Sequence, residues 1–137
     1  MIKLFILLSL FSTKLEYKAE KHLTKYYEHE VILSEGVPFD DGKIYRMLNN
    51  TDFVYIGKSR SKFEYFDYMV LFNENKTIKL VRVLIYRENY GGEVGSRRWL
   101  KQWIGISKPK HMVDAISGAT ISVHSLKQSI NRLLTKV

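Results

Sequence analysis

The chain has 137 residues, of which 45% are hydrophobic and 26% charged, and its formal net charge is +8. This length suits one domain with a buried core, and this composition argues against wholesale disorder. The sequence contains no cysteine, which excludes disulfides, thiolate metal sites and cysteine-held iron–sulfur clusters, so any redox chemistry would require a bound organic cofactor.

The N-terminus, MIKLFILLSLFSTK, places one lysine before an apolar stretch that runs from Leu4 to Phe11. This stretch is too short to span a bilayer as a helix, and its order is typical of a secretory signal. We interpret residues 1–12 as a signal peptide or N-terminal anchor and residues 13–137 as a single domain; a buried first helix is the alternative. We therefore expect an exported bacterial protein, in the periplasm or on the outer face of the cytoplasmic membrane.

An amphipathic helix is predicted for residues 14–30, because Leu15, Ala19 and Leu23 recur every four residues. A turn-rich break follows at residues 34–42. Runs of β-branched and aromatic residues then predict about four strands, at residues 43–48, 53–59, 63–72 and 77–87. The last two strands flank the polar tetrapeptide NENK, which indicates a hairpin.

A glycine-rich loop at residues 88–96 leads into a predicted short helix at residues 96–105, which carries two tryptophans. The apolar residues from Thr120 to the end of the chain recur at helical spacing and predict a long amphipathic helix. Because strands and helices are segregated along the chain, we expect an α+β fold. In this fold an antiparallel meander sheet packs with an N-terminal helix, a short Trp-bearing helix and a long C-terminal helix.

The stretch DAISGATISVHS, residues 114–125, begins this last helix with two hydroxyls around a glycine and an alanine. Ser117 could be an ordinary N-cap, which stabilises a helix by about 1 kcal/mol. That interpretation leaves Gly118 unexplained, because glycine in a first turn costs about 0.5–1 kcal/mol relative to alanine. Alternatively, small residues at a helix N-terminus admit a phosphate close to the backbone, with the Thr120 hydroxyl within reach. Both interpretations remain open at this point.

Residues 114–120, DAISGAT, resemble the flavinylation motif of the FMN-binding domain family, which reads Asp, two variable residues, Ser or Thr, Gly, Ala, then Thr or Ser. The segment YGGEVGS, residues 90–96, is similar to a glycine-rich segment of the same family. The resemblance extends from about Tyr45 to the C-terminus. The family includes subunits of membrane electron-transport complexes and small exported domains.

This resemblance implies that a separate flavin transferase esterifies the hydroxyl of Thr120 to the phosphate of FMN. It also implies a set of cofactor-binding residues. Those expected to line the phosphate are Ser117, Gly118 and Ala119. Asp114 is expected to help the transferase or to order the loop. Those expected beside the flavin are Tyr90, Gly91, Gly92 and Gly95. The basic residues among positions 87–110 would add longer-range attraction, namely Arg87, Arg97, Arg98, Lys101, Lys108 and Lys110.

We therefore predict an exported protein that carries covalent FMN and passes electrons between membrane or extracytoplasmic partners, more an electron carrier than an enzyme with its own substrate. The alternative is a small flavin-dependent reductase that binds FMN non-covalently. A third possibility is a basic binding module without flavin. The basic residues form no run of five, and the four histidines are scattered, so we expect neither a nucleic-acid partner nor a metal site. The sequence predicts no catalytic residues and no oligomeric state.

Overall fold

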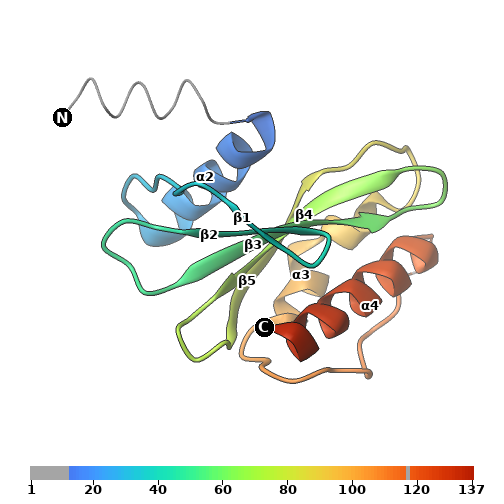
Figure 1. Ribbon diagram of the computed structural model, residues 1–137. Helices are drawn as coiled ribbons and strands as arrows, with labels where there is room; N and C mark the ends of the chain where they lie inside the picture. Colours follow the sequence, from blue (N-terminus) through green and yellow to red (C-terminus); the bar gives the residue numbers. More distant parts are fainter. Residues whose placement is uncertain (1–12, 117) are drawn as a thin grey trace.

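The computed structural model describes residues 13–116 and 118–137. Helix α2 (Lys14–Tyr27) packs on one face of an antiparallel five-stranded sheet, and α3 (Arg97–Leu100) and α4 (Thr120–Lys136) cover the opposite face (Figure 1). The predicted α+β class is therefore confirmed. The predicted signal or anchor, residues 1–12, lies outside the described residues. No helix of the described ranges combines the length and the apolar character needed to cross a membrane.

The sheet is a meander in which each strand pairs with the next along the chain. Its five strands are β1 (Val37–Phe39), β2 (Gly42–Arg46), β3 (Phe53–Arg60), β4 (Tyr65–Phe72) and β5 (Ile78–Ile85). The sequence predicted about four strands, and the additional one is β1, within the segment expected to be a turn-rich break. β1 has only three residues, one of which is Pro38, and an edge strand tolerates a proline because its outer side needs no N–H donor.

Two hydrophobic cores lie on the two faces of the sheet, and β4 contributes to both. Phe66, Tyr68 and Val70 belong to the core beneath α4. Met69 and Leu71 belong to the core beneath α2. Because helices cover both faces, the strand is largely apolar and shows no polar alternation, and its one carboxylate, Asp67, is buried and paired with Arg87.

Helix α2 has a capping box at its N-terminus and a left-handed residue at its C-terminus. At its N-terminus the Thr13 hydroxyl accepts from the Glu16 N–H at 3.1 Å, and the Glu16 carboxylate accepts from the Thr13 N–H at 3.2 Å. At its C-terminus Glu28 adopts a left-handed conformation with φ of 61°. The predicted helix over residues 14–30 is therefore too long, because this cap stops it at Tyr27.

Between β5 and α4 the chain forms the 3-10 helix η1 (Gly92–Gly95), then α3, then the 3-10 helix η2 (Lys101–Trp103). The predicted short helix at residues 96–105 is thus a single α turn that continues as a 3-10 turn. Its two tryptophans, Trp99 and Trp103, are both buried in the core beneath α4. The chain then crosses to α4 as an irregular segment.

Hydroxyl groups fix helix α4 against β3. The Ser59 Oγ lies 2.6 Å from the Ser125 Oγ and 2.9 Å from the Ser129 Oγ. The Arg60 N–H donates to the Ser125 Oγ at 2.8 Å. Since apolar packing tolerates sliding and hydrogen bonds do not, these contacts set the position of α4 along the sheet. They thereby place the first residue of the helix, Thr120.

Candidate functional site

No side chain of the described residues caps the N-terminus of α4. The helix begins at Thr120 with Ala119 in the N-cap position, and alanine offers no side-chain acceptor. The candidate cap Ser117 lies outside the described residues, and the N-cap position itself falls on Ala119. No side chain of the described residues accepts from the first-turn N–H groups. Among the described residues, then, the first-turn N–H groups have no side-chain acceptor, and this end carries the positive end of the helix dipole.

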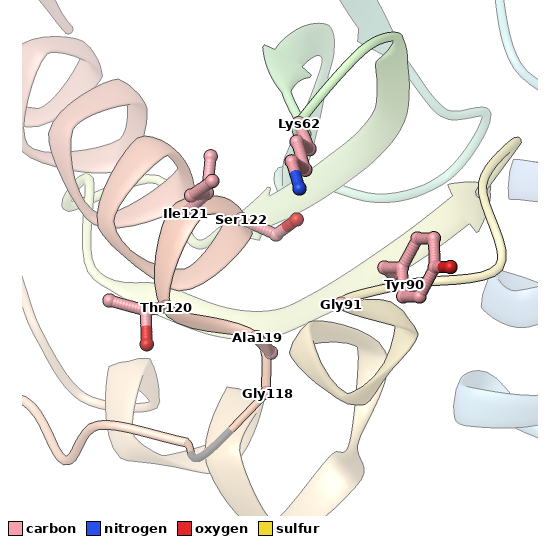
Figure 2. A pocket seen from close by; sticks show the side chains of 8 residues that line it. All are labelled: Lys62, Tyr90, Gly91, Gly118, Ala119, Thr120, Ile121 and Ser122. Atoms are coloured by element: carbon pink, nitrogen blue, oxygen red, sulfur yellow. The ribbon is translucent and has the colours of Figure 1, made fainter.

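A pocket of about 280 Å³ opens at this helix end (Figure 2). It is lined by Lys62, Tyr90, Gly91, Gly118, Ala119, Thr120, Ile121 and Ser122. In Figure 2 Tyr90 stands across the pocket from Thr120, and the Lys62 and Ser122 side chains lie on one side of it. Five residues predicted for the site from two separate segments thus come together here: Tyr90, Gly91, Gly118, Ala119 and Thr120.

Tyr86 and Ser122 tie the glycine-rich loop to the first turn of α4. The Tyr86 hydroxyl donates to the Tyr90 carbonyl at 2.5 Å and lies 2.7 Å from the Ser122 Oγ. Because a phenol carries one proton, that proton goes to the carbonyl and Ser122 donates to Tyr86. Ser122 is then left with acceptor capacity toward the pocket that it lines. Sequence reasoning missed both residues, since neither differs from an ordinary strand tyrosine or helix serine.

In the glycine-rich loop, Gly91 lies directly against the hydrogen-bonded hydroxyls of Tyr86 and Ser122. Its φ is 78°, and a Cβ added there would lie 2.6 Å from the Tyr86 hydroxyl and 2.8 Å from the Ser122 Oγ. No larger residue fits without breaking the hydrogen-bonded pair. A glycine at this position is therefore required by the close approach as well as by the backbone conformation.

The cation at the pocket is Lys62, from the loop between β3 and β4. None of the six basic residues predicted between positions 87 and 110 lines this pocket. Glu88 anchors the Lys62 loop, because its carboxylate accepts from the Ser61 hydroxyl and from the N–H groups of Phe63 and Glu64, at 3.0 Å and 2.9 Å. The sequence offered no signal for Lys62, which reaches the pocket only through this anchored hairpin.

The carboxylate of Glu88 should make the Lys62 loop sensitive to acid. Desolvation would raise the pKa of Glu88, but the hydrogen bonds from Ser61, Phe63 and Glu64 outweigh it and lower the pKa from its ordinary value of 4.5. A carboxyl with a lowered folded pKa stabilises the fold above its ordinary value, and this contribution is lost as the pH falls through the folded value.

We therefore expect Glu88→Gln to reduce the free energy of unfolding near neutral pH. The difference between wild type and variant should shrink as the pH falls through the lowered folded pKa of Glu88, because the carboxyl then becomes neutral like the amide. Urea denaturation of the two proteins at several pH values measures it, with Glu74→Gln as a control on the exposed β4–β5 turn. A difference that does not change with pH would show that the charge of Glu88 has no role.

Three other predicted residues lie outside the pocket lining. Gly92 and Gly95 belong to η1, and a Cβ added to them would meet Tyr86 at 3.8 Å and Val83 at 3.5 Å. Asp114 is exposed and lines a separate hollow of about 500 Å³. The structure thus brings together the start of the glycine-rich loop and the end of the motif, but not these three.

The backbone at Asp114 is held in place by residues of α3 and η2. The Trp99 Nε1 donates to the Asp114 carbonyl at 2.6 Å, and the Asp114 N–H donates to the Gln102 Oε1 at 3.0 Å. The Gln102 amide also donates to the Trp99 carbonyl at 3.1 Å. This network orders the segment that leads to Thr120.

Replacing Trp99 with phenylalanine should destabilise the protein by about 1 kcal/mol more than the same change at Trp103. Trp99→Phe leaves the Asp114 carbonyl without its donor. The Trp103 Nε1, in contrast, is buried without a hydrogen-bond partner among the described residues, so Trp103→Phe removes a polar group that nothing satisfies. Urea denaturation of both variants measures the difference. Equal losses of stability would contradict the importance of the Asp114 contact.

A protein-family model described as FMN-binding domain matches residues 65–135, just over half of the 137-residue chain. The match runs from the start of β4 almost to the end of α4 and contains every residue that lines the pocket except Lys62. No curated protein matches the chain significantly.

Proposed function

We propose that this chain, which belongs to the FMN-binding domain family and is an FMN-binding flavoprotein, carries its FMN covalently and serves as an electron-transfer protein. The proposed bond is a phosphoester to the Thr120 hydroxyl. The observation that carries the proposal is the position of this hydroxyl, on the first residue of α4 and at the wall of the pocket, where no side chain of the described residues caps the helix. In the described part of the chain the Thr120 side chain is exposed and has no hydrogen-bond partner.

The residues around Thr120 suit a phosphate group. The free N–H groups of the first turn and the helix dipole favour negative charge at this point. Lys62 adds a full positive charge from across the pocket. Gly118, with φ of 84° and nothing within 4 Å of an added Cβ, leaves space for the phosphate oxygens. The donors and the free space that a phosphoester needs are therefore present.

The size of the pocket favours a carrier over a reductase with its own substrate. FMN supplies redox chemistry of one or two electrons when bound. A volume of about 280 Å³ lies at the lower limit of ligand pockets, which span about 300–1,000 Å³. A cofactor would largely fill this pocket, so a second substrate would have to bind outside it, and electrons would pass at the exposed rim near Tyr90.

The same small volume favours covalent attachment. A pocket of this size covers only part of a flavin mononucleotide, and affinity without a bond depends on how much surface is buried. A phosphoester removes the risk of dissociation. It also leaves the ring system chemically unchanged, because the bond is formed at the phosphate end. Non-covalent binding therefore remains the second candidate rather than the first.

The proposal includes an exported location, maturation by a flavin transferase and redox partners at a membrane or outside the cytoplasm. Export is supported by the sequence of residues 1–12, and the transferase by the motif DAISGAT. No nucleic-acid partner is proposed.

A visible spectrum before and after acid precipitation tests the proposal. The protein is purified after co-expression with a flavin transferase, and we expect the yellow colour to stay with the precipitated chain. Colour that moves into the supernatant would support the reductase that binds FMN non-covalently. Protein that is colourless from the start would contradict the proposal and favour the flavin-free binding module.

A further inference from the structure

The end of β3 that lies beside the pocket is an open sheet edge. β2 pairs only with residues 53–56 of β3, whereas β4 pairs with the whole strand, residues 53–60. Residues 57–60 therefore have a neighbouring strand on one side only. Along their open side lies a hollow of about 570 Å³ between this edge and α4. The Arg60 N–H at this edge already donates to the Ser125 Oγ of α4 at 2.8 Å. An extended segment in the hollow would therefore be held mainly by side-chain contacts and not by extending the sheet.

Besides Arg132, three cationic residues line this hollow, namely Lys58, Arg60 and Lys62. None forms an ion pair with a described residue. Two of them rest on aromatic rings instead, with the Arg60 guanidinium 5.2 Å from the Tyr65 ring centre and the Lys62 Nζ 5.2 Å from the Phe63 ring centre. These contacts orient the cations without neutralising them.

The one carboxylate among the described residues lining the hollow is already engaged. The Asp41 Oδ2 accepts from Arg132 at 3.0 Å, and its Oδ1 accepts from the Tyr55 hydroxyl at 2.8 Å. Arg132 also donates to Asp40 at 3.0 Å. Asp41 therefore forms no ion pair with Lys58, Arg60 or Lys62, and the positive charge of this edge attracts negative charge toward the hollow.

The hollow adjoins the proposed flavin site. It shares Lys62, Thr120 and Ile121 with the pocket at the start of α4. The loop that carries Lys62 is held by Glu88, so the charged edge is ordered before anything binds. A molecule seated in the hollow would lie against the residue that carries the flavin.

We propose that this basic edge, defined as Lys58, Arg60 and Lys62 with the hollow beside them, docks an extended acidic segment of a partner protein. Carboxylates on such a segment complement the three cations, and the exposed aromatic rings beside them are typical of protein interfaces. A concave site suits an inserted segment better than a flat bilayer surface. That the partner is a redox protein rests on the proposed function; the docking itself does not.

Fluorescence anisotropy of a fluorescein-labelled decaglutamate peptide, titrated with the flavin-free chain at low salt, tests the docking. The double variant Lys58→Glu/Arg60→Glu should weaken binding roughly tenfold or more, because both side chains line the hollow but not the flavin pocket. The control is Lys21→Glu/Lys25→Glu, which makes the same change of net charge on exposed positions of α2. It should weaken binding less than about twofold.

Equal weakening by both pairs would overturn the proposal, because binding would then follow net charge alone. Binding to phosphatidylglycerol vesicles without binding to the peptide would also overturn it, in favour of a membrane contact. The neutral pair Lys58→Gln/Arg60→Gln, checked for unaltered circular dichroism, should show a smaller loss in the same direction. Protein that carries flavin but does not bind the peptide would contradict the docking surface alone. Colourless protein that binds the peptide would contradict only the flavin assignment.

Discussion

Replacing Thr120 with valine should leave a folded protein without covalent FMN. Valine keeps the branched shape of threonine but has no hydroxyl, so the phosphoester cannot form. Because Thr120 has no hydrogen-bond partner among the described residues, the fold should lose little stability. Intact-mass measurement after co-expression with a flavin transferase checks this result. Wild type should gain the mass of FMN less one water, and the variant should gain nothing.

Two further variants test whether attachment needs a hydroxyl and whether it is specific to position 120. Thr120→Ser should keep the full mass gain, since serine supplies the same hydroxyl. Thr135→Val, in the last turn of α4, removes a hydroxyl that donates to the Arg132 carbonyl at 2.6 Å and should also keep it. A full mass gain in Thr120→Val would place the bond elsewhere and remove the basis of the proposed function.

Replacing Gly91 with alanine should lower the free energy of unfolding by about 2–4 kcal/mol, which combines a left-handed backbone with an overpacked contact. The new Cβ would meet the Tyr86 hydroxyl at 2.6 Å and the Ser122 Oγ at 2.8 Å, at a φ of 78°. The hydrogen bond between these hydroxyls must then open, which releases the glycine-rich loop from α4. Urea denaturation measures the loss of stability, and the spectrum of bound flavin reports the change in the pocket.

Gly118 provides the matched control for Gly91. It has a similar φ of 84°, but nothing lies within 4 Å of an added Cβ. Gly118→Ala should therefore show only the backbone strain, about 1–2 kcal/mol. If the two variants lost the same stability, the close approach of Gly91 to Tyr86 and Ser122 would have no energetic consequence.

Much of the architecture was predictable because its signals are local. The spacing of Val123, Leu126 and Ile130 predicted α4, and the structure confirms a helix over Thr120–Lys136. The polar NENK connection predicted the hairpin of β4 and β5, which pair as expected. The strand β1 was missed, because three residues that include a proline carry too little periodicity to be distinguished from a turn.

Part of the pocket was also predictable, because it lies within two short motifs. Gly118, Ala119 and Thr120 stand next to one another in the sequence, and Tyr90 and Gly91 follow one another in the glycine-rich loop. The resemblance implies that both segments contact FMN, and in the structure residues of both line one pocket. The covalent bond to Thr120 stays a prediction.

Lys62, Tyr86 and Ser122 could not have been predicted by the same reasoning. Each is an ordinary residue for its element, and its role depends on a partner 26 to 36 positions away along the chain, as with Glu88 for the Lys62 loop and Ser122 for Tyr86. The longer-range attraction expected from the basic residues among positions 87–110 stays a prediction, and none of these residues lines the pocket. Charge along a sequence does not show which cation a hairpin brings to a pocket.

The sequence by itself determined the fold class, the absence of cysteine chemistry and the threonine at the start of the last helix. These properties depend on residue type and on spacing within one or two turns or strands, which a linear pattern contains. The tertiary structure alone decided the walls of the pocket, the anchoring of the Lys62 loop and the open basic edge of β3. Those features depend on strand register and on where the hydroxyls of Ser125 and Ser129 hold α4 against the sheet. Such long-range pairings arise only when the whole chain has packed.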